Sequence, residues 1–263
     1  MNAPLQERIH PTALVDAAAR LASDVEVGPY AVVGPHVEVG PGSSIGAHTV
    51  LTGHTRIGAN CMILQFASVG EAPQDKKYGG EPTRLEIGNN NTIREFVTLN
   101  RGTVQGGGVT RIGDDNWIMA YVHVAHDCRI GNRTVFANNA QLAGHVEVDD
   151  DAILGAFTAV HQFVRIGGHS ITGLGTILLQ DVPPYVKASG NPTRPYGINA
   201  EGLRRRGFGP PAIVELKRAY RTLYRSGLTL EEARAKISAQ AAAVPELARL
   251  SAFIAAEGRG IIR

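Results

Sequence analysis

The sequence has little cysteine, few aromatic residues and few charges, and each shortage excludes a class of protein. Only Cys61 and Cys128 occur among 263 residues, too few for a disulfide-stapled scaffold, so we interpret both as reduced thiols. Aromatic residues make up 6% and charged residues 19%, while the hydrophobic share is 43%. A chain this apolar and weakly charged can bury a core, which excludes a disordered protein.

Segments that direct a chain to or through a membrane are also absent from the pattern. No run of about 18 apolar residues occurs, so we expect no transmembrane segment. The first eight residues carry no apolar stretch after their charges, so we expect no secretory signal. Together these absences predict a cytoplasmic protein.

Glycine, by contrast, is abundant, with 31 residues, and it accompanies a six-residue repeat. An aliphatic residue is often followed by glycine, as in Val27-Gly28, Val33-Gly34 and Val39-Gly40. Marking every sixth residue gives apolar runs over 9–69, 87–99 and 112–178, broken only by Thr172. A period of six does not fit a helix, which repeats every 3.6 residues. It predicts a parallel β-helix of short strands, three strands and 18 residues to a coil.

Two interruptions of the repeat predict loops that project from the coils. They lie near 70–84 and 101–110, and such loops on a rigid scaffold commonly carry function. The run Gly106–Gly108 is a possible phosphate cradle, but no Gly-Lys-Ser/Thr motif follows it. We therefore interpret this run as a flexible loop.

The repeat ends near 181–184, and the pattern that follows is helical. Pro210-Pro211 begins a helix that Gly227 closes, and Thr229 with Glu232 forms a capping box for the next. Pro245 begins a third helix, which ends before Gly258. The sequence thus predicts a mainly β protein, with a β-helix domain over 1–190 and a small α-helical domain over 191–263. Residues 201–263 contain 12 Lys and Arg against 6 Glu, which fits either an anionic partner or a solvated basic face.

An 18-residue coil brings several chemically useful residues together. His126, Gly144 and Gln162 each lie two positions after a stacked apolar residue, so they form one column, which His145 and His161 flank. A histidine can remove a proton from an attacking hydroxyl, and a glycine N–H can stabilise the oxyanion of acyl transfer. Outward-facing surface histidines are the alternative interpretation.

Zinc binding is a further alternative for this histidine cluster. The γ-class carbonic anhydrases use a His-x4-His spacing on such a helix, whereas this chain offers only His123-x2-His126. Catalytic zinc needs three protein ligands and an open position. We therefore predict no metal.

Motifs outside the repeat make a resemblance specific, and it extends over essentially the whole chain. The chain resembles the UDP-N-acetylglucosamine O-acyltransferases of lipid A biosynthesis, which belong to the hexapeptide acyltransferases with a left-handed β-helix. The matching segments include Ala125-His126-Asp127-Cys128, Leu142-Ala143-Gly144-His145, Arg101-Gly102-Thr103-Val104-Gln105, Gln180-Asp181-Val182-Pro183-Pro184 and Glu201-Gly202-Leu203-Arg204-Arg205.

The resemblance implies an enzyme that transfers a 3-hydroxyacyl chain from acyl carrier protein to the 3-hydroxyl of UDP-N-acetylglucosamine. It implies a homotrimer with active sites between neighbouring chains, no cofactor and no nucleic-acid partner. His126 is expected to be the general base, Gly144 N–H the oxyanion donor, and Asp127 a residue that orients His126 or shapes the site. The acidic carrier protein would account for the basic helical part.

The resemblance also implies substrate-binding residues. Asp75 and Lys77 are expected to contact substrate from across the interface, and Asn199, Glu201 and Arg205 to bind the uridine diphosphate. The residues expected to line the sugar and acyl site are His123, His145, His161 and Gln162.

Two positions depart from the family pattern. Leu174 stands where some members have a glycine that limits the acyl groove, which predicts a shorter 3-hydroxyacyl donor. Pro192 stands where some members have histidine, so any contact from there is in doubt. The alternatives are the sister N-acyltransferase, which normally carries an extra amino-terminal domain for which no room is expected before Ile9, and a non-catalytic hexapeptide scaffold. Chain length and preference for a diamino sugar stay open.

Overall fold

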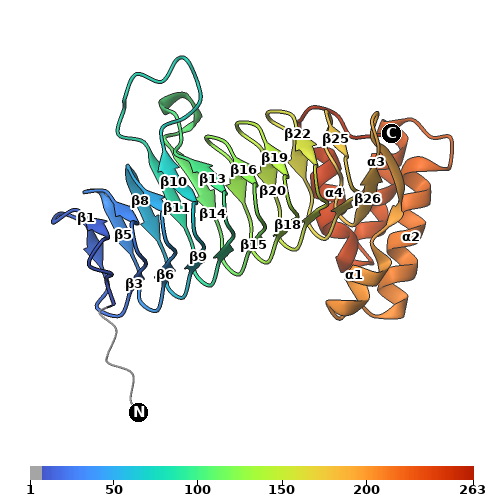
Figure 1. Cartoon of the computed structure of the whole chain (residues 1–263). Coiled ribbons are helices and arrows are strands. Elements are labelled where there is room, and N and C mark those ends of the chain that lie inside the picture. Colours follow the sequence, from blue (N-terminus) through green and yellow to red (C-terminus); the bar gives the residue numbers. More distant parts are fainter. Residues whose placement is uncertain (1–7) are drawn as a thin grey trace, which may run out of the picture.

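The repeat forms a parallel β-helix, and the carboxy-terminal part packs four α-helices against its end (Figure 1). The computed structural model describes residues 8–263. The predicted β-helix domain begins at residue 1, so its first seven residues lie outside this range. The same seven residues belong to the amino-terminal segment in which we expected no secretory signal. Within 8–263, no helix is long and apolar enough to cross a membrane.

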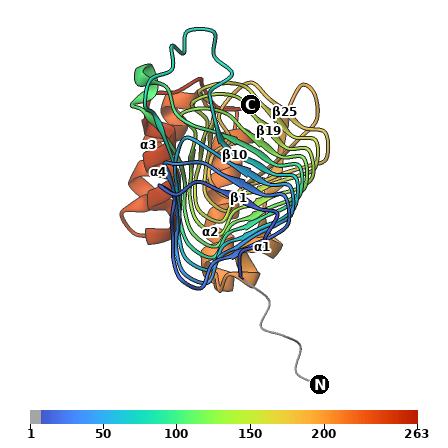
Figure 2. The same cartoon turned by 60° about the vertical axis from the view of Figure 1, so that its left-hand side comes forward.

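The strands line up in three parallel sheets, one along each side of the coil, and Figure 2 shows the coils superimposed nearly end-on. We call them sheets A, B and C. Sheet A contains β3 (Glu26–Val27), β6 (Ser44–Ile45), β9 (Met62–Ile63), β12 (Thr92–Ile93), β15 (Trp117–Ile118), β18 (Val135–Phe136), β21 (Ile153–Leu154), β24 (Ile171–Thr172), β26 (Val186–Ser189) and β27 (Arg194–Ile198).

The other two sheets contain the remaining strands. Sheet B contains β1 (Leu14–Val15), β4 (Val32–Val33), β7 (Val50–Leu51), β10 (Ser68–Glu71), β13 (Thr98–Asn100), β16 (His123–Val124), β19 (Gln141–Leu142), β22 (Ala159–Val160) and β25 (Ile177–Leu178). Sheet C contains β2 (Arg20–Leu21), β5 (Val37–Val39), β8 (His54–Ile57), β11 (Arg84–Ile87), β14 (Val109–Ile112), β17 (Arg129–Ile130), β20 (Glu147–Val148) and β23 (Arg165–Ile166).

The strand register confirms the predicted stacking of apolar residues. Val124 pairs with Leu142 and Leu142 with Val160, and these side chains lie in the buried core. Stacked aliphatic side chains removed from water supply the main favourable term for such a fold. The exception, Thr172, is buried too: its hydroxyl lies 2.8 Å from Gly155 N and 2.8 Å from Thr158 Oγ1. A polar residue is tolerated there because its oxygen is paired.

The carboxy-terminal part begins with strands, which the sequence pattern did not predict. β26 continues sheet A, and β27 pairs with β26 antiparallel, so that this pairing spans the predicted boundary at 190; the Asn191–Pro192 peptide bond between them is cis. The helices are α1 (Ala200–Arg205), α2 (Pro210–Tyr224), α3 (Leu230–Ala241) and α4 (Ala248–Ala255), with a 3-10 turn η2 (Pro245–Leu247). The predicted capping box of Thr229 and Glu232 is confirmed.

Candidate active site

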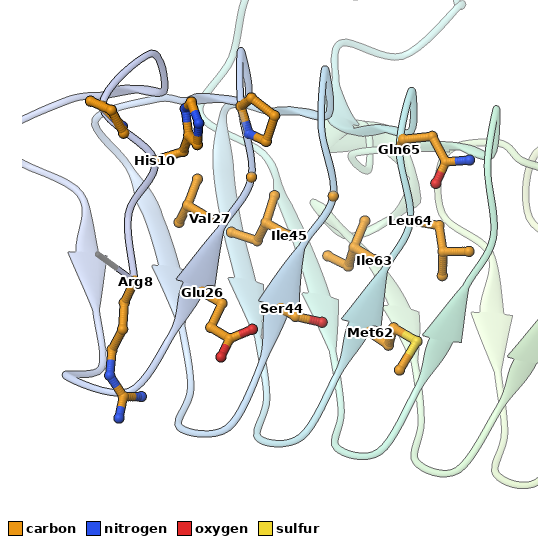
Figure 3. Close-up of a pocket in the computed structure, with 14 residues that line it drawn as sticks. Arg8, His10, Glu26, Val27, Ser44, Ile45, Met62, Ile63, Leu64 and Gln65 are labelled. Atoms are coloured by element: carbon orange, nitrogen blue, oxygen red, sulfur yellow. The ribbon is translucent and has the colours of Figure 1, made fainter. Parts of the chain in front are cut away.

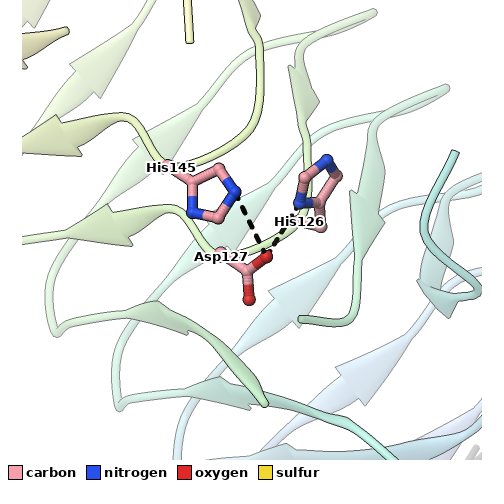
Figure 4. A group of neighbouring side chains, drawn as sticks. All are labelled: His126, Asp127 and His145. Atoms are coloured by element: carbon pink, nitrogen blue, oxygen red, sulfur yellow. Dashed lines mark hydrogen bonds and ion pairs between the residues drawn. The ribbon is translucent and has the colours of Figure 1, made fainter. Parts of the chain in front are cut away.

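Two of the predicted catalytic side chains form a hydrogen-bonded pair at the corner between sheets B and C. His126 Nδ1 lies 2.8 Å from Asp127 Oδ2, and the Asp127 side chain is almost fully buried (Figure 4). Because an ionised carboxylate only accepts hydrogen bonds, Nδ1 carries the proton and Nε2 keeps its lone pair. A neutral histidine in this tautomer is equipped to accept a proton from a substrate.

The predicted column of His126, Gly144 and Gln162 is present, and Gly144 lies directly against the imidazole. A Cβ added at Gly144 would lie 2.5 Å from His126 Cε1 and 2.7 Å from Nε2, so a side chain there would displace the ring. Within 8–263, Gly144 N–H has no acceptor in the chain, whereas the N–H of Ala143 bonds to Val160 O. An unpaired N–H beside a basic nitrogen is the arrangement that an oxyanion site requires.

His145 completes this corner from the next coil. Its ring packs edge-on to His126 at 5.2 Å between centroids and stacks on Phe163 at 4.4 Å. Burial lowers the pKa of His145 despite the opposing charge of Asp127, whose Oδ2 lies 3.8 Å from its Nε2. The His145 imidazole, which packs beside the His126–Asp127 pair, is therefore uncharged at neutral pH.

A cavity of ≈ 730 Å³ opens over the pair, and we call it the corner cavity. Its lining residues are Gln74, Asp75, Lys76, Lys77, Thr103, Gln105, His126, His145, Gln162 and Phe163. Asp75 and Lys77 were expected to reach the site from a neighbouring chain. In the structure they line this cavity together with His126 of the same chain, from the loop that follows β10.

His123 and His161 line a different cavity from His126 and His145. They line a shallow, mainly apolar depression of ≈ 400 Å³ on the outer face of sheet B, which we call the sheet groove. The rest of its lining comprises Gln141, Leu142, Ala143, Ala159, Val160, Ile177, Leu178 and Leu179. Thr98 Oγ1 lies 2.7 Å from His123 Nδ1, and burial lowers the pKa of His123. Leu174 is exposed at the turn that leads into β25 and is not among the residues that line the groove.

The three residues expected to bind the nucleotide lie on or next to α1, at the corner between sheets C and A. The Asn199 side chain caps α1 at Gly202 N and donates to His169 O, a structural role that the sequence did not reveal. Glu201 pairs with Arg204 at 2.9 Å and with Arg205 at 3.4 Å, and all three side chains are exposed. The structure does not bring this group into the corner cavity of the same chain.

His126, Asp127 and His145 are also the one cluster within 8–263 whose ligand atoms lie close enough to share a metal ion. Both oxygens of Asp127, however, already accept hydrogen bonds, from Thr103 and from His126. A metal would have to break the Asp127–His126 contact. The donor set therefore suits proton transfer better than metal binding.

Another cavity, of ≈ 620 Å³, lies at the amino-terminal end of sheet A. Figure 3 shows Glu26, Ser44 and Met62 following one another on successive coils, with Arg8 at the end of the row. Its histidine, His10, is engaged with the Thr12 hydroxyl at 2.9 Å. The N–H groups of its Gly28 and Gly46 are bonded to Ile45 O and Ile63 O, so we place the chemistry at the corner cavity.

Thr103 bonds to Asp127 through its N–H and its hydroxyl, a contact that the sequence reasoning missed. The segment Arg101-Gly102-Thr103-Val104-Gln105 was among the matching motifs, but it did not reveal this partner, because Asp127 lies 24 positions further along the chain. This loop contains a 3-10 turn, η1 (Val104–Gly106), whose Gly106 packs against the Asp127 carboxylate.

Comparison with known proteins gives a consistent result. A model of the family "Udp N-acetylglucosamine O-acyltransferase; Domain 2" matches residues 181–262, and one of bacterial transferase hexapeptides matches 9–53 and 110–144. The chain is 63% identical to the acyl-[acyl-carrier-protein]–UDP-N-acetylglucosamine O-acyltransferase of Thiobacillus denitrificans, covering 97% of this chain and 99% of the relative.

Further matches have the same names. The chain is 59% identical to the enzyme of that name from Herminiimonas arsenicoxydans, over 97% of this chain and 99% of the relative. Among solved structures, LpxA from Acinetobacter baumannii superimposes with a TM-score of 0.95 at 47% identity, covering 98% of this chain and 100% of that one.

Proposed function

The chain belongs to the family of acyl-[acyl-carrier-protein]–UDP-N-acetylglucosamine O-acyltransferases, and from this premise we propose how its residues perform the reaction. The protein is an acyltransferase that moves an acyl group from acyl carrier protein to UDP-N-acetylglucosamine. We further infer that the acyl group is a 3-hydroxyacyl chain and that the acceptor is the sugar 3-hydroxyl. The observation that carries the mechanism is the His126–Asp127 pair with its free Nε2 beside Gly144 N–H.

His126 Nε2 takes the proton of the sugar hydroxyl, whose oxygen attacks the thioester carbonyl carbon. The carbonyl oxygen becomes an oxyanion, which Gly144 N–H stabilises. The tetrahedral intermediate then collapses, the carbon–sulfur bond breaks, and the proton on His126 passes to the departing thiolate of the carrier protein. Asp127 holds the imidazole in the required tautomer and stabilises the imidazolium formed in between.

The two cavities suit different parts of the substrates. The polar corner cavity, with Asp75, Lys77, His145 and Gln162, suits the sugar. The sheet groove is lined mainly by aliphatic atoms and suits an acyl chain, because burying methylene groups is favourable. The exposed Glu201 and Arg205 on α1 suit the diphosphate and uridine of a substrate held between two chains.

A homotrimer is proposed because two sides of the coil are built to meet other chains. The outer face of sheet C carries arginine and glutamate from strand to strand, as in Arg20–Glu38 and Arg111–Glu86, which suits water. Sheet A instead exposes Met62 and Trp117. The corner between sheets A and B carries a ladder of stacked, exposed rings: Tyr30, His48, Phe66, Phe96 and Tyr121, spaced 4.8 to 5.2 Å apart.

If three such three-sided β-helices met with this aromatic corner on a threefold axis, sheet B of one chain would lie opposite sheet A of the next. The sheet groove would then be closed by a neighbour, and α1 of that neighbour would lie beside the corner cavity. Light scattering of the purified protein is expected to give three times the chain mass. A monomer that is fully active would contradict this arrangement.

Both free, buried cysteines fit a cytoplasmic location.

The experiment that tests the function is product analysis. The protein is incubated with UDP-N-acetylglucosamine and a mixed pool of 3-hydroxyacyl carrier proteins, and the products are identified by mass spectrometry. We expect one 3-O-acylated nucleotide sugar to dominate. Absence of any acylated product, or acylation at nitrogen of a diamino sugar alone, would overturn the proposal.

A further inference from the structure

The carboxylate of Asp127 is held by the second projecting loop, which donates hydrogen bonds to both of its oxygens. Thr103 N–H donates to Asp127 Oδ1 at 2.8 Å, and Thr103 Oγ1 donates to Oδ2 at 2.6 Å. Both residues are buried, so these bonds are shielded from water. Hydrogen bonds of this length to an ionised carboxylate are stronger than hydrogen bonds between two neutral groups.

A second neighbour, Gly106, determines which way the Thr103 hydroxyl donates its hydrogen. Gly106 N–H lies 3.2 Å from Thr103 Oγ1 and donates to it, so the single hydroxyl hydrogen is available to Asp127. Gly106 itself packs on the carboxylate, since an added Cβ would lie 2.0 Å from Asp127 Cγ. The loop is therefore folded around Asp127 and leaves the carboxylate little freedom.

Oδ2 of Asp127 is the atom that receives both the Thr103 hydroxyl and His126 Nδ1. Any rotation of the carboxylate would move this oxygen away from the imidazole and change where Nε2 points. We propose that Thr103 is a positioning residue of the acyl transfer, which fixes Asp127 and through it the orientation and proton affinity of His126. This inference rests on the proposed function of His126.

The other groups that face the pair are known, so the effect of Thr103 can be isolated. They are His145 from the next coil, His123 from β16, the buried thiol of Cys128 next to Asp127, and Asp75, Lys76 and Lys77 from the first projecting loop. Each of these residues is retained in a Thr103 variant. Asp127 N–H also stays bonded to Thr110 Oγ1 at 2.8 Å, which keeps the backbone in place.

The test compares Thr103→Val, which removes the hydroxyl at nearly equal volume, with Thr103→Ser, which keeps it. For Thr103→Val we expect kcat to fall about 10-fold to 100-fold, with KM for UDP-N-acetylglucosamine within about twofold, because misalignment affects the reacting atoms. The acidic limb of the pH–rate profile should move to higher pH, since the carboxylate, relieved of the hydroxyl dipole, holds a proton on the imidazole more strongly. Thr103→Ser should restore most of kcat and the original profile.

A matched control is Thr49→Val. Thr49 is also buried and its hydroxyl bonds to Leu64 O at 2.9 Å, but it lies in an early coil remote from the corner cavity. It should lose some thermal stability and keep both kcat and the pH profile. If Thr103→Val fails to fold, the smaller Thr103→Ala serves in its place.

Two outcomes would overturn the inference: a Thr103→Val enzyme with unchanged kcat and pH profile, or a Thr103→Ser enzyme as impaired as Thr103→Val. Wild type and His126→Ala are assayed alongside. An active wild type with an inactive His126→Ala leaves the proposed function standing whatever Thr103 does. An inactive wild type would remove the function itself.

Discussion

At the scale of single residues, the proposed active site depends on Gly144. Gly144 combines two requirements, an unpaired N–H and space for the His126 ring, and only glycine provides both. Its place in the column was predictable from the 18-residue period. Its contact with the imidazole was not, because the period gives the height of a residue along the coil and not the direction of its neighbour's side chain.

Gly144→Ala is expected to lower kcat by about 100-fold or more, because the added methyl would occupy the position of the His126 ring and misalign the base. The coil should stay folded, as judged by circular dichroism and thermal melting. Gly209→Ala is the matched control, since its Cβ would meet only Pro211 Cδ at 3.7 Å. Steady-state kinetics of both variants check this, and full activity of Gly144→Ala would contradict the assignment.

Leu174 is expected to set the accepted chain length. It is exposed in this chain, at the turn leading into β25, whose Ile177 lines the sheet groove. Leu174→Gly should shift the preferred donor to a longer 3-hydroxyacyl chain, because the obstructing side chain is removed. Turnover is compared across a series of donor lengths, and an unchanged preference would refute this role.

At the scale of elements, local sequence signals predicted most of the structure. The six-residue period located the strands because every inward position must be apolar, and the register confirms it through Val124, Leu142 and Val160. Helix signals worked equally well at Pro210 and Thr229. β27 and α1 were missed: β27 pairs across a turn with no repeat to mark it, and α1 has only six residues.

The capping box of α3 gives a prediction about stability. Thr229 Oγ1 accepts from Glu232 N–H at 3.2 Å, and Glu232 accepts from Thr229 N–H at 2.8 Å. Thr229→Ala should therefore lower the free energy of unfolding by about 1 kcal/mol. Denaturant titration measures this, and Thr229→Ser should keep the wild-type value. Equal stability of the Ala variant would show that the cap contributes nothing.

At the scale of the whole molecule, buried histidines make the fold sensitive to acid. Burial lowers the pKa of His123, His145 and His169, so the folded chain binds fewer protons than the unfolded chain below about pH 6.5. The free energy of unfolding should be highest above that pH and fall as pH drops towards 5, by at most about 1.4 kcal/mol per pH unit for each histidine.

His169 tests this dependence outside the corner cavity. Its Nδ1 is buried without a partner among the described residues, and it stacks on Tyr185. His169→Gln should flatten the fall in unfolding free energy between pH 7 and 5, whereas replacing the exposed His10 with Gln should not. Denaturant titrations at several pH values decide it, and identical slopes for wild type and His169→Gln would contradict the account.

Assembly is the level at which a single sequence says least. The pattern of one chain identifies which sheet faces are charged and which are apolar, but not which chain meets them. Asp75 and Lys77 illustrate this: they line the corner cavity with His126 of the same chain, and their contact with substrate across an interface stays a prediction. The nucleotide-binding role of Asn199, Glu201 and Arg205 depends on the proposed neighbour and stays a prediction.

The central claim is that His126 is the general base of acyl transfer. Its most direct test is the turnover of His126→Ala with UDP-N-acetylglucosamine and the preferred 3-hydroxyacyl carrier protein, on protein shown to have the wild-type mass and circular dichroism. We expect kcat to fall by about 10²-fold to 10⁴-fold. A correctly folded His126→Ala enzyme that transfers the acyl group at the wild-type rate would contradict the claim.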